Sequence, residues 1–392
     1  MKKIKCIILL ICVTSSSILN AQESSKIRAR DLGIPFVGTP GKYNAITDIP
    51  GVEVGYKTLI SGNGKLIKGK GPIRTGVTII LPKGKTDTEY SMGYFIFNGN
   101  GEVTGIPFLH DYGQNKGPIG LTNTYSVGVT RDAIGDWCFK NFSLTDNHDF
   151  RFGLPIVGET FDGGLNDING LHIKKEHVFE AINNSKSQAI AEGNVGGGTG
   201  MVCYWFKGGT GTSSRIVNIN GKNYTVGILV QANFGYRKHL TVRGLPLGNF
   251  FSDTLMPAVK QDGSIIAIVG TDAPLTPLQL NLVAKRVTLG ISRTGTIGST
   301  GSGDVFLAFS TQILKENSES LLEINALNSS SLNKVFNATV EVTEEAIINA
   351  LVAAEDMVGI NGNTFFELPH NTTKSLFTKY NNFLKTINME LK

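Results

Sequence analysis

The sequence contains few of the residues that carry metal-dependent or histidine-dependent chemistry. Among its 392 residues there are six histidines and four cysteines, and no spacing of histidine, cysteine and carboxylate is typical of a metal site. The histidines are His110, His148, His172, His177, His239 and His370. None stands in a recognisable Ser/His motif, which argues against a Ser-His-Asp hydrolase, although a triad is defined by geometry and can be hidden in sequence. Neither a metal nor another cofactor is expected.

Long apolar runs are also missing, since no stretch approaches the roughly 20 apolar residues of a transmembrane helix. The first residues have instead the pattern of a secretory signal, with lysines in residues 1–5, an apolar run in residues 6–13 and a cleavage site after Ala21. The sequence therefore predicts a periplasmic mature protein, residues 22–392, with no membrane partner. The positive residues are scattered and the formal net charge is only +5, so no nucleic-acid partner is expected.

Cysteine is too scarce for a disulfide scaffold. Removal of the predicted signal takes Cys6 and Cys12 away and leaves Cys138 and Cys203, both in apolar surroundings. Two buried thiols are expected, while one bridge between them stays open as an alternative.

Glycine and apolar residues are abundant, with 47 glycines and 41% hydrophobic residues. This composition favours a sheet-rich α/β protein with many tight turns. Strands are predicted at residues 77–81, 94–97, 125–129, 156–158, 225–230 and 265–269, and helices at residues 175–183, 276–288 and 343–358. Residues 28–54 are expected to form an irregular arm and residues 317–333 a surface excursion. No linker divides the chain, so one domain is expected.

One junction stands out because Asp262-Gly263-Ser264 leads directly into the apolar strand. A flexible glycine before a serine permits an N→O acyl shift, and hydrolysis of the ester would leave Ser264 as a new N-terminus. That serine would carry a nucleophile and an amine whose reference pKa is about 7.7 to 8.0. Taken alone, however, Gly-Ser before a strand is usually a turn.

Further motifs accompany this junction in a fixed order. They are Thr75-Gly76-Val77-Thr78, Asn98-Gly99-Asn100-Gly101-Glu102, Glu159-Thr160-Phe161-Asp162-Gly163, Glu192-Gly193-Asn194, Gln231-Ala232-Asn233-Phe234-Gly235, Gly270-Thr271-Asp272-Ala273-Pro274 and Gly301-Ser302-Gly303-Asp304. Together with the junction they resemble the self-processing aminopeptidases that include L-aminopeptidase/D-amidase/D-esterase and the bacterial β-peptidyl aminopeptidases. The resemblance extends from about Arg28 to about Ser310.

This resemblance implies an α/β fold, a four-layer α-β-β-α sandwich like that of the N-terminal nucleophile hydrolases. It implies a cut of the single catalytic domain into residues 22–263, the α chain, and residues 264–392, the β chain, with both fragments sharing each sheet. It also suggests a homo-oligomer of such two-chain units, with four as the expected number.

The resemblance also assigns catalytic roles. Ser264 is the predicted nucleophile for both processing and turnover, after cleavage at Gly263. Ser302 and Asp304 would support it as a relay of hydroxyl and acid, where the β-peptide-cleaving members have Glu in place of Asp304. The alternative for Asp304 is a helix N-cap. Asn233 would stabilise the oxyanion, and its alternative is a turn hydrogen bond at a strand end.

Two further residues are assigned to substrate binding. Glu159 ends a strand that is expected to be buried, where a carboxylate is costly unless it meets a cation. The α-ammonium of a peptide would be such a cation, which favours an aminopeptidase, while Arg293 is an alternative partner. Phe161 stands where some relatives carry an aromatic hydroxyl that helps the oxyanion.

The sequence thus predicts a self-processing serine aminopeptidase that releases N-terminal residues from short peptides, amino-acid amides or esters through an acyl-enzyme on Ser264. One alternative is an acyltransferase like the self-processing ornithine acetyltransferases, which use a Thr nucleophile. The other is a secreted binding protein in which Gly263-Ser264 is only a turn. Whether the first residue is an L-α, D-α or β amino acid stays open.

Overall fold

The computed structural model describes residues 26–142, 153–259, 263–312, 315–318, 321–323, 325–387 and 389. The predicted signal, residues 1–21, lies outside these residues. Within the described part of the chain, no helix is long and apolar enough to cross a membrane.

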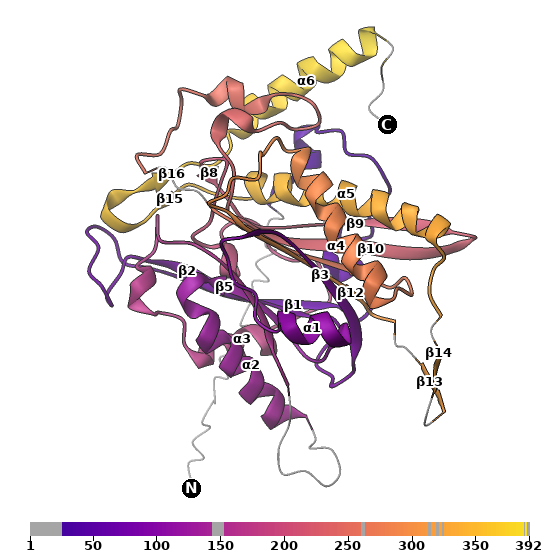
Figure 1. Cartoon of the computed structure of the whole chain (residues 1–392). Helices are drawn as coiled ribbons and strands as arrows, with labels where there is room; N and C mark the ends of the chain where they lie inside the picture. The colour runs from indigo at the N-terminus through magenta and orange to yellow at the C-terminus, as the bar shows by residue number, and fades with distance from the viewer. Residues whose placement is uncertain are drawn as a thin grey trace, which may run out of the picture.

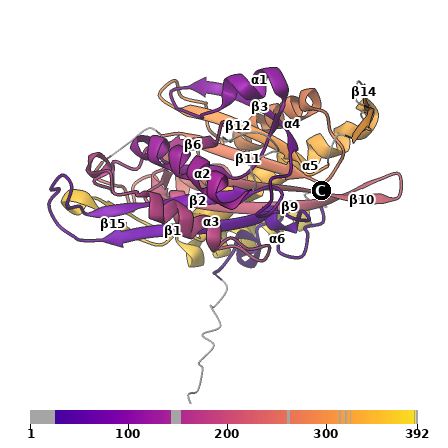
Figure 2. The same cartoon turned by 90° about the horizontal axis from the view of Figure 1, so that it is seen from below.

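Two sheets form the centre of the molecule. The smaller sheet has the strand order β1-β2-β5-β6, and the larger has the order β4-β3-β12-β11-β10-β9. The smaller sheet consists of β1 (Glu53–Ser61), β2 (Ile73–Leu81), β5 (Ile119–Asn123) and β6 (Ile156–Thr160). The larger consists of β3 (Tyr90–Gly99), β4 (Gln114–Asn115), β9 (Gly209–Ile219), β10 (Lys222–Ala232), β11 (Ile265–Thr271) and β12 (Gly303–Ser310). The long β9–β10 hairpin extends toward one end of the molecule (Figure 2).

Helices cover the outer face of each sheet. The helices are α1 (Ile106–Tyr112), α2 (Val127–Asn141), α3 (Lys175–Asn183), α4 (Pro277–Ser292), α5 (Ser329–Val352) and α6 (His370–Thr386). α2 and α3 pack on the smaller sheet, while α4 and α5 pack on the larger one (Figure 1). Short two-stranded pieces complete the fold: β7 (Val202–Cys203) with β8 (Phe206–Lys207), β13 (Lys315–Ser318) with β14 (Leu321–Glu323), and β15 (Met357–Val358) with β16 (Thr364–Phe365).

Three apolar cores separate these layers. Ile80, Ile119 and Ile268 belong to the core between the two sheets. A second core, which includes Ile134, lies between the smaller sheet and its helices, and a third, which includes Val283, lies between the larger sheet and α4 and α5. The predicted four-layer sandwich is therefore confirmed, because each sheet buries one face against the other sheet and one against helices.

The two sheets differ in how they are assembled from the chain, and here one expectation was wrong. All four strands of the smaller sheet precede Gly263, whereas β11 and β12 follow it and stand in the middle of the larger sheet. Only the larger sheet is therefore shared by the two segments on either side of Gly263. Two central strands give the second segment an extensive hydrogen-bonded contact with the first.

The predicted strand at residues 125–129 was also wrong. Residues 124–126 form a 3-10 turn and α2 begins at Val127. The buried positions continue at Thr130, Ala133 and Ile134, a spacing of three and four residues that places them on one helix face. The short apparent alternation at 125–129 concealed this longer helical period.

The helix predicted at residues 343–358 begins and ends earlier in the structure. α5 starts at Ser329, inside the expected surface excursion, and its N-cap is Asn328, whose side chain accepts a hydrogen bond from Ser331 N at 2.9 Å. The Thr343-Glu344-Glu345 segment, predicted as an N-terminal cap, lies in the middle of this helix and is buried. Its carboxylates are matched by arginines rather than by a helix N-terminus.

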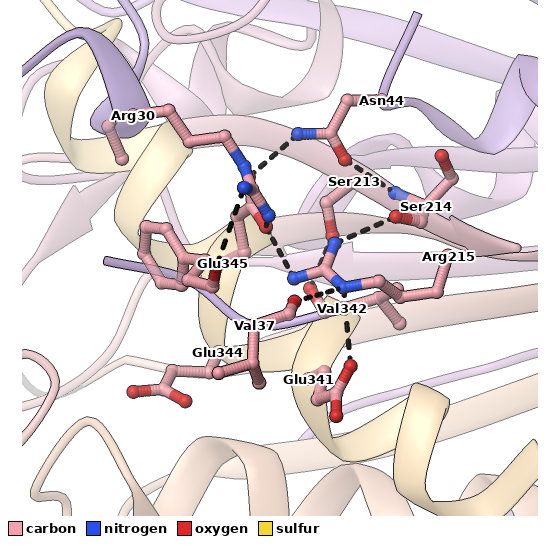
Figure 3. A network of polar contacts seen from close by, with 12 residues as sticks. Arg30, Val37, Asn44, Ser213, Ser214, Arg215, Glu341, Val342, Glu344 and Glu345 are labelled. Atoms are coloured by element: carbon pink, nitrogen blue, oxygen red, sulfur yellow. Dashed lines mark hydrogen bonds and ion pairs between the residues drawn. The ribbon is translucent and has the colours of Figure 1, made fainter. Parts of the chain in front are cut away.

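The N-terminal arm is held against α5 by a buried cluster of charges, the Glu345 cluster (Figure 3). Glu345 is fully buried and accepts two hydrogen bonds from Arg30 at 2.7 and 2.8 Å, one from Asn44 at 2.7 Å and one from Arg215 at 2.6 Å. Arg215 also lies 3.3 Å from Glu341. Arg30, Asn44 and Arg215 precede Gly263, so the cluster joins the two segments of the chain.

Cys138 and Cys203, the two cysteines expected in the mature chain, are buried thiols, as predicted. Cys138 lies on α2 in the core beneath the smaller sheet, and Cys203 lies on β7 in the core of the larger sheet.

Candidate active site

Strand register gathers the predicted catalytic residues at one end of the larger sheet. β11 pairs with β12 in parallel, with Ile265 opposite Asp304. It pairs with β10 in antiparallel fashion, with Ile265 opposite Ala232, so that Ser264 and Asn233 are adjacent. On the far side of β12, Asp304 pairs with Asn98 of β3. Residues spread over more than 200 positions therefore converge on the start of β11.

Ser264 lies at this convergence and is buried. Its Oγ accepts a hydrogen bond from Gly303 N at 2.9 Å, and its carbonyl oxygen accepts one from Asn233 N at 3.0 Å. Ser264 is thus held by main-chain N–H groups on both sides, its hydroxyl by Gly303 and its carbonyl by Asn233. A hydrogen bond donated to Oγ favours the alkoxide character that develops when the hydroxyl loses its proton.

Ser302 connects the Gly263 carbonyl to Asp304. Its Oγ lies 2.6 Å from the Gly263 carbonyl oxygen and 2.6 Å from Asp304 Oδ1. A hydroxyl has one proton, so it donates to one of these two acceptors at a time. When the Asp304 carboxyl is protonated, that carboxyl donates to Ser302 Oγ and Ser302 donates to the Gly263 oxygen. Burial raises the pKa of Asp304. This arrangement allows a proton to move along the line from Asp304 through Ser302 to the Gly263 oxygen.

Asp304 is further held by two neutral donors. Asn98 Nδ2 donates to its Oδ2 at 2.8 Å and Ile265 N donates to its Oδ1 at 3.1 Å. It lies within β12 and is therefore not the helix N-cap that was the alternative. Asn98 was not assigned a role from the sequence, although it stands in the Asn-Gly-Asn-Gly-Glu motif that carried part of the resemblance.

Asn233 packs directly against the Gly263 main chain. A Cβ on Gly263 would lie 1.8 Å from the Asn233 carbonyl oxygen and 2.6 Å from Asn233 Nδ2, so no larger residue fits here without displacement. The Asn233 amide accepts from Val202 N at 2.7 Å through Oδ1 and donates to the Phe161 carbonyl at 3.0 Å through Nδ2. These contacts fix the amide orientation and leave Nδ2 beside Gly263. Both bonds reach residues far from Asn233 in the sequence, so its side chain does not form the strand-end turn hydrogen bond that was the alternative role.

Glu159 is the penultimate residue of β6 and is only 4% exposed. Its Oε1 accepts a hydrogen bond from Glu102 N at 2.9 Å, and its Oε2 accepts one from Thr124 Oγ1. Burial raises its pKa. Arg293, the alternative partner, lies 3.4 Å from Glu344 instead. The carboxylate of Glu159 therefore has only neutral donors among these contacts.

Glu159 also lies near Gly303, whose N–H donates to Ser264 Oγ. A Cβ on Gly101 would lie 3.0 Å from Gly303 Cα and 3.3 Å from Glu159 Oε1. A single methyl group on Gly101 would therefore be in close contact both with this carboxylate and with Gly303, the residue that binds Ser264 Oγ. Phe161, two residues after Glu159, is 41% exposed. A group of three or more metal-ligating side chains does not occur in the described ranges.

Comparison with known proteins gives the same picture over most of the chain. Residues 44–365 match peptidase family S58. The chain is 48% identical over 371 residues to the β-peptidyl aminopeptidase BapA of Sphingosinicella microcystinivorans, which covers 90% of this chain and 92% of that protein. It is 44% identical to the β-peptidyl aminopeptidase BapA of Sphingosinicella xenopeptidilytica, covering 88% of this chain and 89% of the relative.

Solved structures agree with this comparison. The L-aminopeptidase D-Ala-esterase/amidase of Ochrobactrum anthropi, described as a prototype of the serine aminopeptidases and a variant of the Ntn hydrolase fold, superposes with a TM-score of 0.85 at 42% identity and covers 90% of this chain and 99% of that one. A β-aminopeptidase of a Burkholderia species superposes with a TM-score of 0.82 at 39% identity, with coverages of 90% and 99%.

Fold and site together define a serine aminopeptidase of the N-terminal nucleophile class of hydrolases. Within that class the chain belongs to peptidase family S58.

Proposed function

We propose that this aminopeptidase cuts its own chain between Gly263 and Ser264 and then uses Ser264 as the nucleophile of turnover. The observation that carries the proposal is the position of Ser302. Its hydroxyl lies 2.6 Å from the carbonyl oxygen of Gly263, while the neighbouring Gly303 N–H holds the Ser264 Oγ. Carbonyl, nucleophile and proton donor are thus held at the start of one buried strand.

In the proposed processing step, Ser264 Oγ attacks the Gly263 carbonyl carbon and loses its proton. The Gly263–Ser264 C–N bond breaks, the proton passes to the departing Ser264 nitrogen, and an ester joins Gly263 to Ser264 Oγ. Water then hydrolyses this ester to give the Gly263 carboxylate and a free Ser264 amine. Ser302 donates to the oxygen on which negative charge develops, which is the contact that stabilises a transition state.

In turnover, the freed amine of Ser264 takes the proton from its own hydroxyl as Oγ attacks the substrate carbonyl. The leaving amine or alcohol receives a proton, an acyl-enzyme forms, and water hydrolyses it. Asn233 Nδ2 lies beside the position of Gly263 and is the proposed donor to the oxyanion. Because Phe161 has no hydroxyl, Asn233 and main-chain N–H groups must supply this stabilisation.

The proposed substrates are short peptides, amino-acid amides and esters with a free amino terminus. Glu159 is a buried carboxylate that accepts neutral donors, and a substrate ammonium would supply the opposite charge. Two similar proteins are β-peptidyl aminopeptidases, so we include peptides that begin with a β-amino acid. The signal pattern supports a periplasmic location, and the resemblance supports an oligomer of two-chain units.

Replacement of the nucleophile tests this proposal. Ser264→Ala is expected to leave an uncut chain with no hydrolysis of amino-acid amides, because both steps need Oγ. Ser310→Ala is the matched control, since Ser310 is a buried serine at the far end of β12 that donates to Ala273 O at 2.7 Å. Mass spectrometry and an amidase assay measure both properties. Cutting at Gly263 in the Ser264→Ala variant would refute the proposal.

A further inference from the structure

A lysine without an acidic hydrogen-bond partner is buried close to the catalytic amide. Lys207, on β8, is 0% exposed. Its Nζ donates to the carbonyl oxygens of Met201 at 2.7 Å, Gly208 at 2.8 Å and Gly198 at 3.5 Å. Burial lowers the pKa of Lys207 to about 7. Removing an amine from water costs free energy that carbonyl acceptors only partly offset, so this position calls for an explanation.

The shortest of these contacts, to the Met201 carbonyl, connects Lys207 to Asn233 through one rigid peptide unit. The Met201 carbonyl and the Val202 N–H belong to the same planar peptide. Lys207 Nζ donates to the oxygen on one edge of it, and the N–H on the opposite edge donates to Asn233 Oδ1 at 2.7 Å. Movement of this peptide would therefore move the acceptor side of the Asn233 amide.

The hairpin that carries this peptide is strained at its tip. Tyr204 and Trp205, between β7 and β8, have φ values of 51° and 57°, a left-handed conformation that is uncommon for bulky residues. Arg237 donates to their carbonyl oxygens at 3.0 and 2.6 Å. Strained turns persist where surrounding contacts over-determine them, and here Arg237 fixes the tip while Lys207 fixes the base next to Asn233.

We propose that Lys207 is a positioning residue for catalysis, which holds the Met201–Val202 peptide so that Asn233 presents Nδ2 to the oxyanion. This inference rests on the proposed role of Asn233. Donation from Lys207 to the Met201 carbonyl also polarises the peptide and strengthens the bond from Val202 N–H to Asn233 Oδ1. With Oδ1 held in this way, the amide cannot turn its oxygen toward the developing negative charge.

A double-mutant cycle tests the inference on the full protein. Asn233→Ala is expected to lower kcat by about 100-fold or more, as the loss of an oxyanion donor does. Lys207→Met, of similar length but without donors, should lower kcat about tenfold while KM stays within about twofold, because the contact matters in the transition state. In the Asn233→Ala background the Lys207→Met change should have no further effect on kcat, because the Asn233 amide through which Lys207 acts is absent.

Lys83→Met is the matched control, because Lys83 Nζ also donates to a backbone carbonyl, that of Thr311, at 2.8 Å without contacting the hairpin. It should leave kcat unchanged. If Lys207→Met does not fold, Lys207→Gln takes its place in the same cycle.

Unchanged kcat in the Lys207 variant, or equal losses in the presence and absence of Asn233, would overturn the inference and leave the proposed function intact. Unchanged kcat in Asn233→Ala alone would instead refute the oxyanion role, and the inference with it.

Discussion

Two groups of buried carboxylates in this molecule have opposite surroundings. Glu345 is paired with Arg30 and Arg215 in the cluster that binds the N-terminal arm (Figure 3). Asp304 and Glu159, at the candidate active site, accept hydrogen bonds from amide, hydroxyl and main-chain N–H donors.

The difference appears in the acid strength of these groups. Burial alone would raise the pKa of Glu345, but hydrogen bonding to Arg30 and the charge of Arg215 lower it overall. Burial raises the pKa values of Asp304 and Glu159, and their neutral donors only reduce that effect. A carboxylate paired with arginines serves structure. One with neutral donors stays able to exchange a proton or to receive a substrate cation.

The largest effect on stability should come from breaking the charged group. Glu345→Gln leaves Arg215, itself buried, without its closest anion, and removing one partner of a buried pair costs about 3 to 5 kcal/mol. Urea unfolding should show this loss. Glu355→Gln, which removes an exposed partner of Lys26 at 3.0 Å, is the control and should cost less than about 1 kcal/mol.

The stability that Glu345 contributes should also depend on pH. Because the pKa of Glu345 is lowered on folding, its contribution is present above the ordinary glutamate pKa and is lost as pH falls through the lower folded value. The difference between wild type and Glu345→Gln should therefore shrink in acid. A difference that grows as pH falls would contradict the assignment.

A smaller effect, on recognition rather than stability, is expected at Glu159. Glu159→Gln should process normally but lower kcat/KM for substrates with a free amino terminus by about 10- to 100-fold, the value of one hydrogen bond to a charged group. Steady-state kinetics measure it. Glu102→Gln is the matched control at a pH where Glu159 is fully ionised, since it preserves the Glu102 N–H that donates to Glu159. Equal kinetics in wild type and Glu159→Gln would remove its recognition role.

The smallest effect is expected in the pH dependence of the inhibition constant, Ki, of a substrate analogue that binds Glu159. An amino alcohol keeps the ammonium of the substrate but has no carbonyl, so its Ki depends on Glu159 and not on the nucleophile. Because the pKa of Glu159 is raised, acidification should weaken binding of the amino alcohol at a higher pH than it would with a glutamate of ordinary pKa. The charge of Glu102 contributes to that raised pKa, so Glu102→Gln should move the loss to lower pH. No movement would exclude this coupling.

Much of this arrangement could be predicted from sequence where local patterns decide it. The strand after Ser264 and the helix at residues 175–183 have clear apolar periods, and both are present. Helix α5 was misjudged because Glu344 and Glu345 look like solvent-exposed residues of a first turn. Only the arginines brought to them by the fold allow such residues to be buried.

The candidate site divides in the same way. Motifs assigned five residues to the site, and the structure brings these residues together: Ser264, Ser302, Asp304, Asn233 and Glu159. The residues that hold them could not be predicted from motifs. The contact of Asn98 with Asp304 depends on strand register, and the contact of Lys207 with Met201 depends on the β7–β8 hairpin.

The intact mass of the purified protein, together with its N-terminal sequence, tests the proposed self-cleavage at Gly263 directly. We expect two fragments, the second beginning Ser-Ile-Ile-Ala and comprising residues 264–392. A single chain that still contains the Gly263–Ser264 bond, in a preparation that hydrolyses amino-acid amides, would contradict the proposed self-cleavage.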